Sequence, residues 1–136
     1  MEIEIIDLNE EQVEDIKSRL DSYDKNHITY RMSGEIKLGI IHNDKLVAGI
    51  IGCMTAFRIF YVSTMYVDET CRGKGLGTRL IKELETKAIQ LGANMIRLDT
   101  FDWQGAEFYK KMEYTQVGSY KNDIDGFVEY FFLKRL

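Results

Sequence analysis

The chain has 136 residues, of which 45% are hydrophobic and 29% charged, and this composition predicts one globular domain over residues 1–136. Its formal net charge of −4 argues against a nucleic-acid-binding surface, which would be basic. No apolar run approaches the roughly 20 residues of a membrane-spanning helix. Cys53 and Cys71 have no metal-ligand spacing, so we expect reduced thiols, no metal and a cytoplasmic location. From the charge and the short apolar runs, we expect neither a nucleic acid nor a membrane as a partner.

The first elements follow from alternation and capping. Residues 2–8 alternate charged and apolar side chains, which predicts a strand. Asn9 can cap a helix over residues 10–22, with Gln12 at the capping-box position. Apolar residues at helical spacing predict that one face of this helix is buried, namely Val13, Ile16 and Leu20. Residues 23–34 are polar and aromatic, and form either a short second helix or a loop.

A meander of three strands comes next. Two apolar runs, residues 36–41 and 46–54, flank a polar stretch from His42 to Lys45 that has the composition of a hairpin turn. A third apolar, β-branched run over residues 60–67 follows. We expect these three segments to pair as antiparallel strands.

The second half of the chain mixes helices and strands. A helix over residues 78–91 carries an apolar stripe at Leu80, Ile81, Leu84, Ala88 and Leu91. Gly92 is expected to end that helix, and residues 94–100 read as a strand, which implies parallel pairing with the strand before the helix. A short helix over 104–112 precedes strands near 113–120 and 127–135. The sequence thus predicts an α+β fold whose sheet is antiparallel at both ends and has a parallel pair in its middle.

The most informative segment is the glycine-rich turn Arg72-Gly73-Lys74-Gly75-Leu76-Gly77, between a strand and a helix. Glycines let the backbone turn several N–H groups toward one ligand, and the helix N-terminus adds partial positive charge. This arrangement predicts a phosphate site. The nucleoside-triphosphate pattern G-x-x-x-x-G-K-[ST] is absent, and the dinucleotide pattern G-x-G-x-x-G fails because the third glycine comes one residue early.

The pattern that fits is R-x-x-G-x-G, formed by Arg72, Gly75 and Gly77, which resembles the acyl-CoA loop of the GNAT acyltransferase superfamily. The segment from Trp103 to Tyr114 resembles the second signature of that superfamily, N-x-x-A-x-x-F-Y-x-x-x-G-F. Residues that match are Ala106, Phe108 and Tyr109; residues that depart are Trp103 for Asn, Glu113 for Gly and Tyr114 for Phe. Glu69 also stands where many members have proline.

The resemblance implies a single-domain GNAT fold, with a splayed central parallel pair of strands and flanking helices. It implies an N-acetyltransferase that transfers an acetyl group directly from acetyl-CoA to a primary amine of a small molecule or protein. Tyr109 would be the general acid toward the departing thiolate. The donor would be bound by the strand before the loop and by the loop itself, at Met65, Tyr66, Val67, Arg72, Gly73, Lys74, Gly75, Leu76, Gly77 and Thr78.

Several alternatives stay open. Glu69, Asp99 and Asp102 are candidates for the general base. The resemblance implies that a backbone N–H near Met65 or Tyr66 holds the oxyanion. The two histidines, His27 and His42, are more simply explained as surface residues, and Cys71 is not assigned as a nucleophile.

The acceptor amine is not identified by the sequence. Aromatic residues of two segments are candidates for its pocket: Tyr23, Tyr30, Tyr120 and Phe127. The alternative function is a non-catalytic acyl-CoA-binding or sensing module, and the departures in the second signature favour it. The apolar strand from Tyr130 to Leu133 is compatible with a monomer or a homodimer.

Overall fold

The structure is a computed structural model that describes residues 1–28, 30 and 32–136. It consists of two compact units, residues 1–31 and residues 32–136, and each is treated by itself. The helices are α1 (Glu10–Asp24), α2 (Leu76–Gln90) and α3 (Ala106–Lys111), with a short 3-10 helix, η1 (Glu69–Cys71). The strands are β1 (Glu35–His42), β2 (Lys45–Met54), β3 (Ile59–Val67), β4 (Met95–Phe101), β5 (Thr115–Lys121) and β6 (Val128–Arg135).

The N-terminal unit holds α1, and its start confirms the capping prediction. Asn9 accepts a hydrogen bond from the Gln12 N–H at 2.8 Å, and the Gln12 side chain accepts one from the Asn9 N–H at 3.1 Å. The apolar face predicted to be buried is not buried within residues 1–31, where Val13 is half-buried and Ile16 and Leu20 are exposed. Residues 25–27 form a turn rather than a second helix, and Thr29 and Arg31 lie outside the described residues.

The strand predicted over residues 2–8 is also wrong. The segment is extended chain without strand pairing, and its isoleucines are exposed. The described part of residues 1–31 contains one helix and no strand that could pair with this segment. Alternation predicts which face of a strand is apolar, but a strand also needs a neighbour to satisfy its backbone groups.

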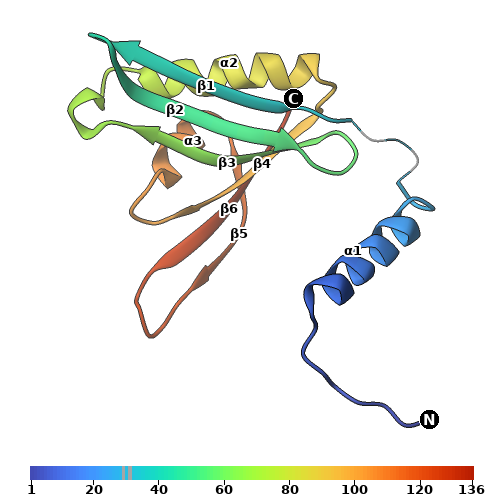
Figure 1. The fold of residues 1–136 in the computed structure, drawn as a ribbon. Helices are drawn as coiled ribbons and strands as arrows, with labels where there is room; N and C mark the ends of the chain where they lie inside the picture. Colours follow the sequence, from blue (N-terminus) through green and yellow to red (C-terminus); the bar gives the residue numbers. More distant parts are fainter. Residues whose placement is uncertain (29, 31) are drawn as a thin grey trace. The chain divides into compact units, whose positions relative to one another are not determined.

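Residues 32–136 form the mixed sheet that the sequence predicts, in the order β1-β2-β3-β4-β6-β5 (Figure 1). The first three strands are an antiparallel meander, and β3 pairs with β4 in parallel. The β1–β2 turn is narrower than expected: Asn43 and Asp44 alone connect the strands, both with positive φ, as a two-residue hairpin turn requires. The chain then places β6 between β4 and β5, so β5 becomes an edge strand.

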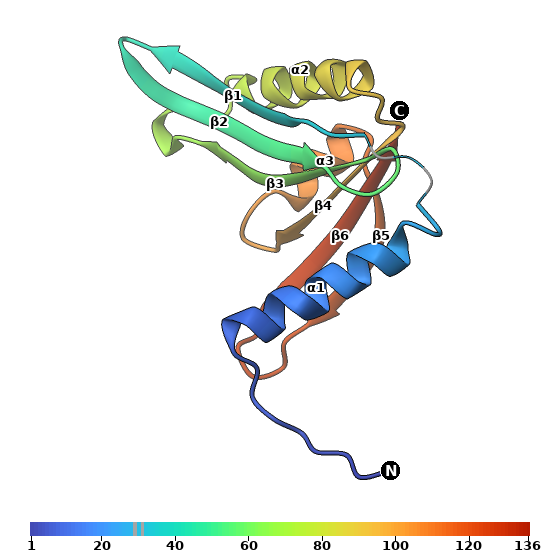
Figure 2. The same ribbon diagram turned by 45° about the vertical axis from the view of Figure 1, so that its right-hand side comes forward.

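The core lies between one face of this sheet and α2. Fully buried side chains from both layers meet there, among them Ile50, Phe60, Ile81, Leu84, Ile96 and Phe132. The predicted stripe of α2 is confirmed at Leu80, Ile81, Leu84 and Ala88, and Gly92 follows the helix with φ +101°. Turned by 45°, the ribbon shows β5 and β6 leading away from the β1–β3 meander and its helix (Figure 2). The sheet is thus two antiparallel halves joined through β3 and β4.

Candidate functional site

The glycine loop connects η1 to α2 and is shaped by backbone conformation. Gly73 and Gly75 have φ values of +76° and +78°, which L side chains rarely adopt, and a Cβ at either position would meet nothing within 4 Å. Gly75 is also the N-cap residue of α2, and within residues 32–136 no side chain caps that helix. The N–H groups of its first turn are therefore available to an anion.

Arg72 closes the base of the loop. Its Nε donates a hydrogen bond to the Val67 carbonyl oxygen at 2.8 Å, and its guanidinium lies 5.4 Å from the centre of the Tyr66 ring. Lys74 is exposed within the loop. Arg72 thus joins the loop to the end of β3 while it adds positive charge there.

The two central strands separate just before the loop. Within residues 32–136, all of which the structure describes, β3 and β4 pair at three positions only. Ile59–Tyr61 of β3 lie beside Met95–Arg97 of β4. A bulge in β3 lies directly after the last pair: Ser63 is the extra residue, because Val62 pairs with Gly52 and Thr64 with Ile51. A bulge bends its strand, which explains why β3 leaves β4 here. The backbone of Met65, Tyr66 and Val67 consequently has no β4 partner on that side.

Tyr109 points toward this separation from the core side. Its side chain is 7% exposed, and its hydroxyl lies 3.9 Å from the Met65 sulfur, a contact that is long for a strong hydrogen bond. Its ring packs edge-on against Phe108 and Tyr114 and tilted against Phe132. Burial raises the pKa of Tyr109 to about 12, so the hydroxyl keeps its proton at neutral pH.

Gly77, in the first turn of α2, allows α2 to pack closely against α3, the helix that carries Tyr109. A Cβ on Gly77 would lie 3.2 Å from the Met65 methyl and 3.3 Å from the Phe108 ring. The third glycine of the loop therefore serves close packing among α2, β3 and α3, whereas Gly73 and Gly75 serve backbone conformation.

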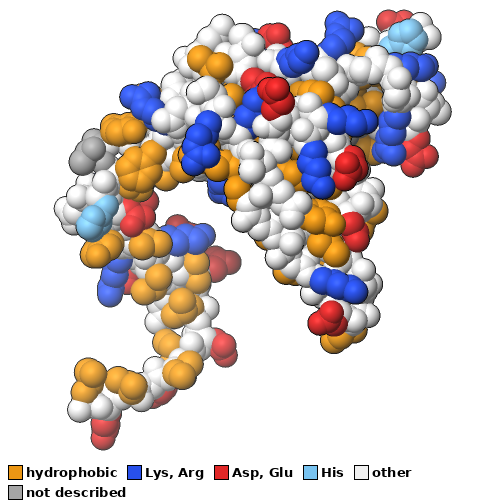
Figure 3. Space-filling view, turned by 180° about the vertical axis from the view of Figure 1, so that it is seen from behind, with side chains coloured by type: hydrophobic (Ala, Val, Ile, Leu, Met, Phe, Trp, Pro, Cys, Tyr) orange, Lys and Arg blue, Asp and Glu red, His pale blue; other side chains and the backbone are white. Residues whose placement is uncertain are grey.

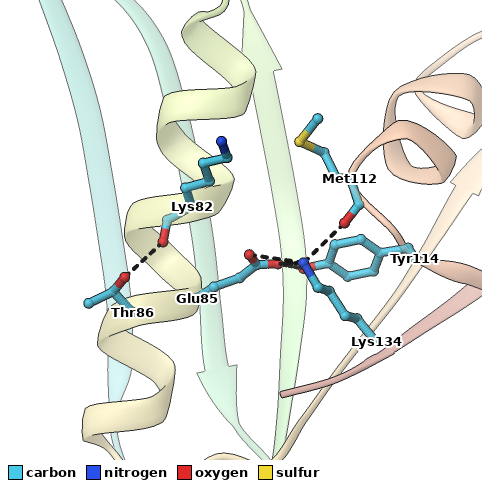
Figure 4. Close-up of polar contacts among 6 residues, drawn as sticks. All are labelled: Lys82, Glu85, Thr86, Met112, Tyr114 and Lys134. Atoms are coloured by element: carbon cyan, nitrogen blue, oxygen red, sulfur yellow. Dashed lines mark hydrogen bonds and ion pairs between the residues drawn. The ribbon is translucent and has the colours of Figure 1, made fainter.

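A polar network that the sequence did not predict holds the end of α3 (Figure 4). Lys134 of β6 donates to both Glu85 oxygens, at 3.0 and 3.2 Å, and to the Met112 carbonyl oxygen at 3.0 Å. The Tyr114 hydroxyl donates to the same Glu85 carboxylate at 2.9 Å. The ion pair is mostly buried, with 21% and 14% of its side chains exposed. Burial first, and then the Glu85 charge, raise the pKa of Tyr114 far above its usual value.

Two features of the sequence could have indicated this network. Glu85 lies four residues after Ile81 and three before Ala88, which puts a carboxylate at the edge of the buried stripe of α2. Tyr114 stands where the GNAT signature has Phe, and its added hydroxyl is the atom that binds Glu85. Glu113, at the glycine position of the signature, has φ +68°, so the left-handed backbone is kept without glycine.

The three candidates for the general base differ in their positions and hydrogen-bond partners. The Asp102 carboxylate accepts the Val128 N–H at 3.2 Å and so fixes the start of β6. Glu69 lies in the first turn of η1. Asp99, exposed on β4, accepts a hydrogen bond from the Tyr61 hydroxyl at 3.0 Å. Of the three, Asp99 is the one that stands beside the separation of β3 and β4.

The remaining candidates fall in different places. His42 is the last residue of β1, and the His27 ring lies 5.2 Å from the Tyr23 ring in residues 1–31. Tyr120 and Phe127 come together in the other unit, with ring centres 6.3 Å apart. The two cysteines are free. Among the described residues, no helix is both long and apolar enough to cross a membrane.

The acidic excess of the chain is not spread evenly. Nine acidic and four basic residues lie in residues 1–31, which leaves 13 acidic and 14 basic residues in 32–136. Seen from behind, the upper part of that second unit shows Lys and Arg side chains at many places (Figure 3). The unit that carries the glycine loop is therefore close to neutral, with basic groups available to a polyanionic ligand.

Comparison with known proteins gives consistent matches. The model of the Acetyltransferase (GNAT) family matches residues 3–114. Blasticidin-S acetyltransferase of Streptomyces morookaense is 29% identical over 93 residues, which cover 68% of each chain.

Solved structures are similar over more of the chain. An acetyltransferase from Bacillus cereus ATCC 14579 is 30% identical, covers 98% of each chain and superposes with a TM-score of 0.90. A GNAT family acetyltransferase from Elizabethkingia anophelis with acetyl-CoA bound is 13% identical, with a TM-score of 0.62 and coverage of 88% and 83%, and shares the fold. The loop, the separated strands and these matches lead to one conclusion: the chain belongs to the Acetyltransferase (GNAT) family.

Proposed function

We propose that the protein is an acetyl-CoA-dependent N-acetyltransferase that transfers an acetyl group directly to a primary amine. The observation that carries this proposal is the approach of the Tyr109 hydroxyl to Met65, on the strand that leaves β4 just ahead of the glycine loop. β3 thus runs from the buried Tyr109 hydroxyl to the glycine loop, which is the anion site. A pantetheine arm that lay along β3, with its pyrophosphate at the loop, would have its thioester beside Tyr109.

The donor fits the residues present. The N–H groups of residues 73–78 would bind its pyrophosphate, and Arg72 and Lys74 would add charge. The open space above Gly73 and Gly75 gives the phosphates room at the backbone. The backbone edge of Met65, Tyr66 and Val67 has no β4 partner, although the Val67 carbonyl is bonded to Arg72; this edge would bind the amide groups of the pantetheine arm, as an added strand does.

The reaction forms one N–C bond and breaks one C–S bond. A neutral amine attacks the thioester carbonyl, the tetrahedral intermediate expels the thiolate, and the amine loses a proton while the sulfur gains one. A lysine-like amine has a pKa of about 10.4, so keeping it neutral at pH 7 costs roughly 4–5 kcal/mol. Asp99 is the carboxylate best placed to receive the amine's proton.

Tyr109 would act by hydrogen bonding to the departing sulfur. Because its pKa is about 12 and that of a simple thiol about 8.5, full transfer of its proton would be uphill by roughly 5 kcal/mol. A neutral hydroxyl in a dry site can nevertheless stabilise the developing thiolate, and the amine's released proton then restores neutrality. The same burial that raises the pKa keeps this donor protonated throughout the neutral range.

Tyr109→Phe tests the assignment. We expect kcat for acetyl transfer to fall about 100-fold or more, while the Kd of acetyl-CoA, measured by calorimetry, stays within about twofold. Tyr130→Phe, which changes a half-buried tyrosine of β6 with no assigned role in the site, is the matched control. Unchanged turnover in Tyr109→Phe would remove Tyr109 from the mechanism. Failure of the wild-type protein to bind acetyl-CoA would contradict the whole proposal.

The alternative, a non-catalytic acyl-CoA-binding module, rested on the departures in the second signature. Two of those departures keep the structure around Tyr109: Glu113 keeps the left-handed backbone, and Tyr114 adds a bond to Glu85. We therefore favour the enzyme. The acceptor would be a small molecule or a protein, and the free cysteines are compatible with our proposal of a cytoplasmic location, as monomer or homodimer.

A further inference from the structure

Four aromatic residues gather where β4 ends and the β5–β6 hairpin turns, and we call them the aromatic surface: Phe101, Trp103, Tyr120 and Phe127. The rings of Phe101 and Trp103 are stacked, with centres 4.6 Å apart and planes 4° from parallel. Phe127 meets both edge-on, at 5.3 and 6.1 Å. Trp103 remains 66% exposed and Tyr120 46% exposed, so these rings are packed together and still reach solvent.

The aromatic surface lies on the side of the sheet away from α2. Phe132 points into the core against Tyr109, so its neighbour Phe131 on β6 points to the opposite side. Glu129 lies two residues from Phe131 and pairs across the sheet with Phe101 and Tyr120. Tyr109 and the aromatic surface thus flank the end of β4 from opposite sides.

Two carboxylates border these rings. Glu129 accepts a hydrogen bond from the Tyr120 hydroxyl at 2.6 Å. Asp99 lies two residues before Phe101 on β4, on the same side of the sheet, and accepts a hydrogen bond from the Tyr61 hydroxyl at 3.0 Å. One guanidinium is also on this side, since Arg97 lies 4.4 Å from the centre of the Tyr61 ring, toward β3. Around Glu129, aromatic faces and negative charge therefore occur together, which is the chemistry that binds organic ammonium groups.

The aromatic surface also lies close to the place where the donor arm is proposed to bind. Asp99 and Phe101 lie beyond Arg97, the last β4 residue that pairs with β3, so they border the stretch where the donor arm is proposed to bind. An amine that attacks from this side must be neutral, and the attacking nitrogen cannot itself be the bound cation. A cation at Glu129 has to be a different group of the same acceptor.

We propose that the acceptor is an amine with a second, cationic amino group, and that Glu129 and the aromatic surface hold this second group. The inference rests on the proposed N-acetyltransferase function and specifies its substrate class. It makes Glu129 and Trp103 determinants of specificity, since they bind a part of the acceptor that does not react. A monoamine of the same length would lack the anchored group.

The first test is binding, and it uses the sole tryptophan of the sequence, Trp103, as the reporter. Trp103 fluorescence is titrated with 1,4-diaminobutane and with 1-aminobutane. We expect a saturable change with the diamine at concentrations at least tenfold below any change with the monoamine. Glu129→Gln should weaken the diamine response at least tenfold, whereas Glu83→Gln, at an exposed carboxylate of α2, should leave it unchanged.

The second test is turnover with the same two amines and acetyl-CoA, read by thiol release. We expect kcat/KM for the diamine to exceed that for the monoamine at least tenfold, and Glu129→Gln to abolish the preference without a change in the KM of acetyl-CoA. Equal responses to the two amines in either test, or an unchanged preference in Glu129→Gln, would overturn the inference alone. Binding of the diamine without thiol release from any amine would overturn the proposed function and leave the binding site standing.

Discussion

The glycine loop and α3, the two sides of the proposed site, are built by different means. The loop is built from backbone: Gly73 and Gly75 adopt positive φ, and the groups offered to a ligand are main-chain amides. The α3 side is built from side chains, because Tyr109 carries the hydroxyl and Glu85, Tyr114 and Lys134 fix the end of its helix. A backbone site needs a strict glycine pattern, whereas a side-chain site tolerates substitutions that are compensated elsewhere. In this chain the first motif is intact, whereas the second is altered at Trp103, Glu113 and Tyr114.

The largest effect is expected from the side-chain half. Lys134→Met would leave Glu85 without its cation and the Met112 carbonyl without its donor, both in a mostly buried place. We expect a loss of about 2–3 kcal/mol in the free energy of unfolding, below the full cost of a wholly buried pair because some exposure remains. Urea unfolding measures it. Lys87→Met, at the exposed pair with Glu83, should change stability by less than about 0.5 kcal/mol.

Alkaline pH sharpens the contrast between the buried tyrosine and the open loop. Tyr109 has a pKa of about 12 in the fold and about 10 when unfolded, so the unfolded chain binds fewer protons between these values. Its contribution is fully present below pH 10 and is lost as pH rises toward 12, by about 2–3 kcal/mol. The free energy of unfolding, measured at increasing pH, should therefore decrease less steeply for Tyr109→Phe than for the wild type. Tyr23→Phe, at an exposed tyrosine, should follow the wild type; identical slopes for all three would contradict the burial of Tyr109.

The backbone half is tested at Gly75. Gly75→Val would force a β-branched residue into φ +78°, at a cost of about 1–2 kcal/mol, although its side chain meets no neighbour. We expect the Kd of acetyl-CoA to rise about tenfold, with kcat at saturation little changed. Gly75→Asn should lose less affinity because asparagine tolerates this conformation. A larger effect on kcat than on Kd would show that the two halves are not separable.

The smallest effect is expected where the second motif departs without a compensating contact. Glu113 occupies the left-handed region at φ +68°, so Glu113→Gly should relieve strain and raise the free energy of unfolding by about 0.5–1 kcal/mol. Thermal unfolding would measure the gain, and kcat should not change. A loss of stability in this variant would mean that the Glu113 side chain stabilises the fold through a contact that offsets the strain.

Much of the fold could be predicted because its signals are local. The Asn9–Gln12 capping box, the Asn43–Asp44 turn and the stripe of α2 each depend on residues a few positions apart. The wrong predictions depended on partners instead. Residues 2–8 alternate correctly but have no strand beside them in their unit, and the described part of residues 1–31 contains no second element that could cover the apolar face of α1.

For the site, the glycine pattern predicted the loop, whereas the bulge at Ser63 and the pairing of Glu85 with Lys134 arise from contacts between distant segments. The order of β6 and β5 is of the same kind, because either strand could follow β4 in a sheet. The assignments of Tyr109 and of the donor-binding residues stay predictions that the variants above test.

Within residues 32–136, only three residue pairs join the halves of the sheet, at Ile59–Tyr61 and Met95–Arg97. If the donor binds along Met65–Val67, it supplies hydrogen bonds that β4 does not provide there, and the ligand stabilises the site that binds it. Amide hydrogens of β3 beyond the bulge that face away from β2 should then exchange more slowly when donor is present, and the whole unit should gain stability in proportion to the logarithm of donor concentration. The free energy of unfolding of this protein would then depend on the donor concentration even before any acetyl group is transferred.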